Sequence, residues 1–111
     1  MELPGFLRSL NAVDLPIPED AVSTNAIQSD KGLMVIFSIH RDIEIPPHSH
    51  KGQWGTVLDG SLELTISGET RTYRPGDCYN IPAGAEHSAR LKAGTKVLDL
   101  FEEPDRYALK P

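Results

Sequence analysis

The sequence predicts an all-β protein, a β-sandwich or a small barrel, on two observations. Nine glycines and nine prolines are spread over 111 residues, so turn-forming positions recur along the whole chain. Between them run short apolar or alternating segments, repeated about every 8–12 residues, which is the spacing of sandwiches and barrels. No internal repeat or linker divides the chain, and at this length one domain is expected.

The N-terminal part of the chain is expected to differ from the rest. Residues 1–21 are rich in proline, which removes backbone donors, and should form an arm that lies over the domain or over another subunit. Residues 22–111 should form a single β-domain. Its first strands are expected at Val22–Gln28 and Leu33–Ile39, joined by a hairpin loop. Pro46-Pro47 should end the second run, because proline cannot donate to a β-ladder.

The second half of the chain continues the pattern. Asp59-Gly60, one of the strongest hairpin dipeptides, follows a segment of strand character, and Leu62–Ile66 then alternates apolar and polar residues. The expected strands are Trp54–Leu58, Leu62–Ile66, Thr70–Arg74, Cys78–Ile81, His87–Leu91 and Lys96–Phe101. The charged tail after Phe101 is expected to be solvated or packed at a subunit boundary, with a short helical turn near Pro104–Leu109.

Composition excludes several classes of function. The 16 acidic residues outnumber the 11 basic ones, for a net charge of −5, which argues against a nucleic-acid partner. One cysteine cannot make an intramolecular disulfide or a CxxC site. The longest apolar run, Leu33–Phe37, is far short of the ~20 residues of a membrane span, and Pro4-Gly5 interrupts any signal peptide. We therefore expect no membrane partner and a cytoplasmic location.

Histidines supply the main candidate for chemistry. Alternate residues of a strand share a face, so His48 and His50 should point two imidazoles at one spot, as a metal requires. Two solvent-exposed histidines on a strand would have the same spacing, so this pair alone does not decide between a metal site and a surface position. Gln53 opens the next strand and can offer its side-chain carbonyl. A G(x)5PxG(x)2H run from Gly76 to His87 brings a third imidazole to a strand start.

Two segments, PPHSHKGQWGTVLDG and PGDCYNIPAGAEH, resemble the two signature motifs of the cupin superfamily, and the resemblance extends over about Leu33–Phe101. It implies an antiparallel jelly-roll β-barrel with one metal bound in its open mouth, and a homodimer. The metal ligands implied by position are His48, His50, Gln53 and His87.

This chain departs from the family pattern at three positions. Gln53 stands where the family most often has Glu, and its spacing from His50 is shorter than usual. Leu91 replaces the usual Asn of the second motif, and Asp42 the first Gly. Neutral imidazoles and an amide leave the charge of a divalent ion uncompensated, which disfavours carboxylate-preferring Mn²⁺. The cofactor is therefore expected to be one Zn, Ni, Fe or Cu ion.

The resemblance leaves three functions open. The first is a metal-dependent enzyme acting on a small molecule, whose class (dioxygenase, isomerase or lyase) the fold does not separate. The alternative is a non-catalytic module that binds a small molecule or a metal. The third is a metal-free barrel with vestigial ligands.

Other reactive side chains have simpler interpretations. Cys78 is expected to be a small buried residue and His40 a surface residue. Tyr79 and Trp54 are expected in the core or at an interface. Asp99 lies either on the exposed face of its strand or at the barrel mouth, and the sequence does not decide between these positions.

Overall fold

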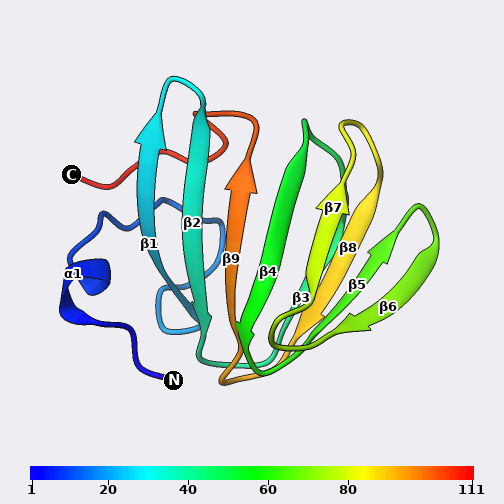
Figure 1. Ribbon diagram of the computed structural model, residues 1–111, viewed down its shortest axis with the longest axis horizontal. Coiled ribbons are helices and arrows are strands. Elements are labelled where there is room, and N and C mark those ends of the chain that lie inside the picture. The colour runs from blue at the N-terminus through cyan, green and yellow to red at the C-terminus, as the bar shows by residue number, and fades with distance from the viewer.

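Two antiparallel sheets form the computed structural model, which describes residues 1–111 (Figure 1). One sheet has five strands in the order β1-β2-β9-β4-β7, and the other has four in the order β3-β8-β5-β6. The strands are β1 Val22–Ser29, β2 Gly32–Ile39, β3 Ile43–His48, β4 Gln53–Asp59, β5 Leu62–Ile66, β6 Glu69–Tyr73, β7 Cys78–Ile81, β8 His87–Leu91 and β9 Lys96–Phe101. The all-β jelly-roll prediction is confirmed.

The core lies between the sheets, and strand alternation explains its composition. In β5, Leu62 and Leu64 are buried while Glu63 between them is exposed. They join a cluster that includes Val57 and Val97 of the five-stranded sheet. Fully burying such aliphatic side chains stabilises the fold by about 1.5–3 kcal/mol each.

One strand, β3, was not expected. The prediction that Pro46-Pro47 would end the second run was wrong, because β2 already ends at Ile39 and both prolines lie within β3, at the edge of the four-stranded sheet. Its register against β8 shifts from Ile45 opposite Ala89 to His48 opposite His87. Neither proline therefore has to donate a backbone hydrogen bond to β8. The same irregularity brings His48 beside His87.

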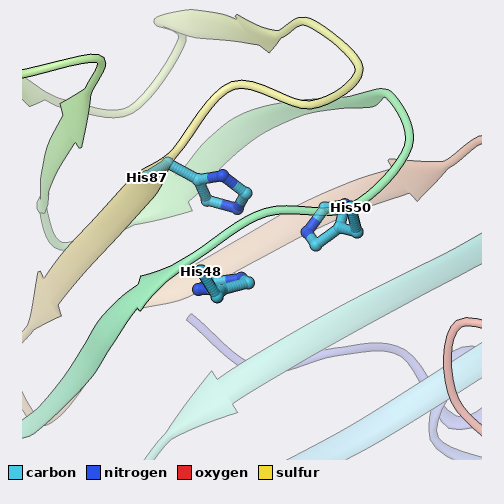
Figure 2. A group of neighbouring side chains, drawn as sticks. All are labelled: His48, His50 and His87. Carbon is cyan, nitrogen blue, oxygen red and sulfur yellow. The ribbon is translucent and has the colours of Figure 1, made fainter.

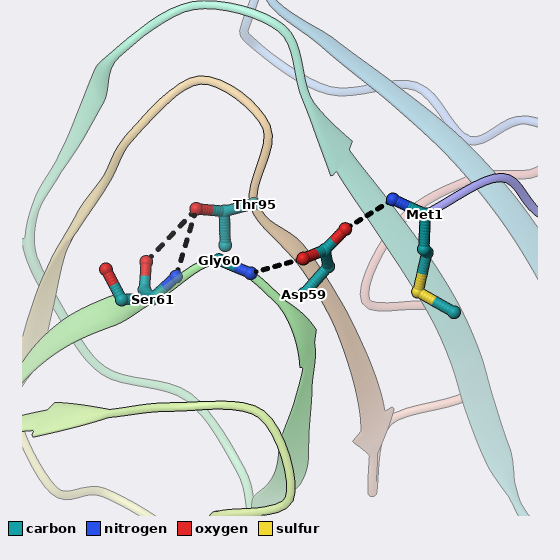
Figure 3. Close-up of polar contacts among 5 residues, drawn as sticks. All are labelled: Met1, Asp59, Gly60, Ser61 and Thr95. Atoms are coloured by element: carbon teal, nitrogen blue, oxygen red, sulfur yellow. Dashed lines mark hydrogen bonds and ion pairs between the residues drawn. The ribbon is translucent and has the colours of Figure 1, made fainter.

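The turn at Asp59-Gly60 also differs from its prediction (Figure 3). It makes no hairpin, because β4 pairs with β7 and β9 whereas β5 pairs with β6 and β8. It carries the chain from one sheet to the other. Gly60 has φ +76°, and a Cβ there would lie 2.6 Å from Oγ1 of the buried Thr95, which donates to the carbonyl of Ser61 at 3.1 Å. The N-terminal amine pairs with Asp59. The hairpin predicted between β1 and β2 is confirmed.

The two terminal segments lie together beside β1 (Figure 1). The N-terminal one contains an unexpected one-turn helix, α1 Gly5–Arg8. Val13 is buried and bridges to Leu109, and the amide of Lys110 donates to the carbonyl of Ala12 at 2.8 Å. No helix forms near Pro104–Leu109: the amide of Arg106 closes a single turn on the carbonyl of Glu103 at 3.2 Å, and the end of the segment pairs with the N-terminal one. No helix in the structure has the length and apolarity to cross a membrane.

Candidate metal centre

Three histidines converge inside one end of the barrel (Figure 2). His48 ends β3, His50 follows in the loop, and His87 begins β8. Their ligand nitrogens all lie within 4.8 Å of one another, and the rings of His48 and His87 are closest, with centroids 4.2 Å apart. The structure thus brings together the three imidazoles singled out in the sequence.

Backbone contacts fix the tautomer of each ring. The Nδ1 atoms of His48, His50 and His87 lie 2.9, 2.6 and 3.0 Å from the carbonyl oxygens of residues 46, 51 and 85. A carbonyl only accepts, so each Nδ1 carries a proton and donates it. In the neutral rings the Nε2 lone pairs are then free for a ligand. Nε2 of His50 and of His87 are buried without any hydrogen-bond partner, as expected of atoms that coordinate an ion.

Electrostatics favours the neutral state of the two deeper rings. Burial lowers the pKa of His50 and of His87, more than their backbone hydrogen bonds raise it. The nearby Arg106 guanidinium and the neighbouring imidazoles lower both pKa values further. Both rings are therefore neutral at pH 7, the state in which imidazole binds a metal.

Gln53, the fourth residue expected at the site, begins β4 and lines the same cavity as the three histidines. Its side-chain amide also lies beside Asp99, where it helps to hold down the pKa of that carboxyl group. A carboxylate attracts the NH₂ end of an amide, and this leaves the carbonyl oxygen of Gln53 for another partner.

Asp99, whose position the sequence left open, faces the interior. It is 4% exposed, and Oδ1 accepts a hydrogen bond of 2.6 Å from the hydroxyl of Tyr79. Burial raises the pKa of Asp99 to about 6, against the opposing effect of Tyr79 and Gln53. The flanking residues could have indicated this inward orientation, since Val97 and Phe101 lie on the same face of β9 as Asp99 and both are buried.

Strand β7 reverses one expectation. Tyr79 and Ile81 point inward, so Cys78 points outward, and the prediction that Cys78 is buried was wrong. Trp54 is 40% exposed and so is not a core residue, whereas the surface position predicted for His40 is confirmed.

The histidines open into a cavity of about 680 Å³ between the sheets, of whose 25 lining residues 16 are hydrophobic. Most of its wall is aliphatic or aromatic. Besides the three histidines, the charged and amide side chains in the lining are those of Glu44, Gln53, Asp99 and Arg106. Arg106 was missed because it lies in the tail, where nothing in the local pattern indicates a position over the barrel.

Comparisons with known proteins agree with this geometry. Residues 35–101 match the family model described as "Cupin domain". The chain is 42% identical over 62 residues to quercetin 2,3-dioxygenase of Bacillus subtilis (strain 168), a match that covers 54% of this chain and only 18% of that protein.

Solved structures share the whole fold. KdgF from Halomonas sp. is 28% identical with a TM-score of 0.72, over 85% of this chain and 86% of that one. An RmlC-like cupin from Shewanella frigidimarina NCIMB 400 is 19% identical with a TM-score of 0.77, over 96% and 94%. With its two motifs, its jelly-roll topology and a family match over more than half of its length, the chain belongs to the cupin family.

Proposed function

We propose that this protein binds one divalent transition metal through His48, His50 and His87, with Gln53 as the fourth ligand, and is a metal-dependent enzyme acting on a small molecule. The observation that carries the proposal is the pair of buried, unpartnered Nε2 atoms at the centre of three rings anchored through Nδ1. Leaving such atoms unpaired costs about 1–3 kcal/mol each, a cost that coordination removes.

The donor set supports an imidazole-preferring ion. No charged ligand is among the four residues, so Zn²⁺, Ni²⁺, Fe²⁺ or Cu²⁺ is favoured over Mn²⁺. The neighbouring Asp99 supports Gln53 as a ligand, because it attracts the NH₂ end of the amide and leaves the carbonyl oxygen for the metal.

The cavity supports catalysis over a purely structural metal. A closed structural site has no space beside the ion, whereas here the histidines face about 680 Å³ of mostly apolar space that a small substrate can enter. The local similarity to quercetin 2,3-dioxygenase also favours an enzyme. Dioxygenase, isomerase and lyase remain the candidate reaction types. The alternative is a non-catalytic module that uses the same cavity to hold a small molecule.

The test is metal analysis of the protein purified without oxygen. Wild type and His40→Ala should each hold about one transition-metal ion, and His87→Ala should hold almost none. His40 is the matched control, since it is exposed and hydrogen-bonded to Ser23 on another part of the molecule. Unchanged metal in His87→Ala would remove the assignment. Metal loss with a large drop in melting temperature would identify a structural ion, and metal loss with little drop a functional one.

We also propose a homodimer, which an apolar row on the outer face of the five-stranded sheet supports. Ile27, Leu100 and Trp54 are 51%, 45% and 40% exposed. Met34 lies between Ile27 and Leu100, and Leu100 lies beside Trp54, so the row crosses four adjacent strands. Such a surface is typical of an interface.

Light scattering should show a dimer for wild type and a monomer for Leu100→Glu. The exposed Glu63 on the other sheet supplies the control, Glu63→Gln, which should remain dimeric. A wild-type monomer at high concentration would exclude the dimer.

A cytoplasmic location also remains our proposal, since a reducing compartment keeps an exposed thiol such as that of Cys78 unpaired.

A further inference from the structure

Arg106 places a cation without an acidic partner at the wall of the metal-site cavity. Arg106 takes part in none of the five ion pairs of the molecule. Its Nε is buried and has no hydrogen-bond partner. Arginine stays protonated and has five donors, so a buried donor without an acceptor is an unusual arrangement.

The acids that line the same cavity are already engaged. Asp99 accepts the hydroxyl of Tyr79 at 2.6 Å, and Glu44 lies 3.3 Å from Arg90 on the neighbouring strand. Neither lies within ion-pair distance of Arg106. Arg106 is therefore left as a cation in the cavity wall with no carboxylate within ion-pair distance and with a buried donor free for a ligand.

Packing holds Arg106 at this position. Its guanidinium carbon lies 4.7 Å from the centre of the Tyr107 ring, in a cation–π contact. Tyr107 packs edge-on against Phe101, with centroids 5.6 Å apart, and Phe101 contacts His50 at 5.9 Å. The segment is tied down by the bridge between Leu109 and Val13. The N-terminal segment thereby holds the tail that carries Arg106 over the cavity.

We propose that Arg106 binds the anionic group of the ligand, so that this site takes small organic anions, with a carboxylate or phosphate on Arg106 and an apolar body among the aliphatic side chains. This inference rests on the proposed function for the role of the cavity. Carboxylate and phosphate groups both match the forked N–H donors of a guanidinium, and the unpaired Nε–H is one of these donors. A metal ion held by neutral ligands in the same cavity adds to the attraction for a negative charge.

The proposal is tested by calorimetry on Zn²⁺-loaded protein with three probes of one size class: benzoate, phenyl phosphate and the neutral benzamide. Wild type should bind at least one anion about tenfold or more tighter than benzamide, the preference expected of charge-assisted hydrogen bonds. Arg106→Gln should lose this preference while it retains zinc and its affinity for benzamide. The control Arg74→Gln removes an exposed arginine that lies outside the cavity, and it should behave as wild type.

The outcomes separate this proposal from the metal site. The ratio of the affinities for benzoate and phenyl phosphate shows which oxyanion the site prefers. Equal binding of anions and benzamide, no binding of any probe, or an anion preference that persists in Arg106→Gln would each overturn the role of Arg106. If wild type holds no zinc, the metal proposal fails, and the same titrations on metal-free protein still decide whether Arg106 selects anions.

Discussion

Tyr79 and Asp99 share a 2.6 Å hydrogen bond that passes over a glycine inside the barrel. They lie on β7 and β9, and β4 runs between them with Gly55 directly opposite both residues. Because Gly55 has no side chain, the phenol and the carboxylate meet across the intervening strand. The bond forms part of the cavity wall next to Gln53, so it also shapes the surroundings of the proposed metal site.

Gly55→Ala should be strongly destabilising. A Cβ at this position would lie 2.2 Å from Oδ1 of Asp99 and 2.4 Å from the hydroxyl of Tyr79, and neither buried group can move away freely. We expect a loss of about 3 kcal/mol in the free energy of unfolding, measured by urea denaturation. Gly5→Ala is the control, since its nearest neighbour would be 4.0 Å away. Equal stability of the two variants would contradict this close packing around Gly55.

Asp99→Asn should change how stability depends on pH in metal-free protein. The pKa of Asp99 is raised from 3.8 to about 6 by burial, so between these values the folded state binds more protons than the unfolded state. Wild type should therefore lose up to about 3 kcal/mol relative to Asp99→Asn as the pH rises from about 4 to 6. Both proteins contain the same histidines, so their contributions cancel in the difference. Parallel stability curves, measured by denaturation in EDTA, would exclude a raised pKa.

Tyr79→Phe should leave a buried carboxylate without its best donor. Burial and the charge of Asp99 raise the pKa of Tyr79, so the phenol stays protonated and donates throughout the neutral range. The variant should lose about 1–3 kcal/mol at pH 7.5. A double-mutant cycle with Asp99→Asn measures the coupling of the pair. A coupling energy of zero would show that the two side chains do not interact in solution.

Gln53→Glu should shift metal preference toward Mn²⁺. A carboxylate compensates one charge of the ion and is a ligand type that Mn²⁺ prefers, so the ratio of Mn²⁺ to Zn²⁺ affinity should rise about tenfold. The new charge also lies beside Asp99, and the metal-free variant should be less stable than wild type. The control, Asn80→Asp, adds the same charge at an exposed position of β7. Competition titrations that give one ratio for all three proteins would exclude Gln53 as a ligand.

Local sequence was sufficient for most strands and for the convergence of the histidines. Alternation and turn residues located eight of the nine strands, and His48, His50 and His87 meet as their spacing and motifs predicted. These features succeed because a turn residue or a two-residue period acts over only a few neighbours. Pro46-Pro47 gave a wrong prediction because prolines are tolerated in a strand at the edge of a sheet. Whether a strand lies at an edge depends on the other strands and not on its own sequence.

By itself the sequence determined the strand segments, the turns and the set of imidazoles. Tertiary structure alone decided that Asp59-Gly60 crosses between sheets and that Asp99 faces inward while Cys78 faces outward. It also decided that Arg106, from the tail, lies at the cavity. The physical reason is that strand pairing and side-chain orientation depend on contacts between segments far apart in the chain. Burial and charge compensation act between such segments, and a pattern of neighbouring residues does not contain them.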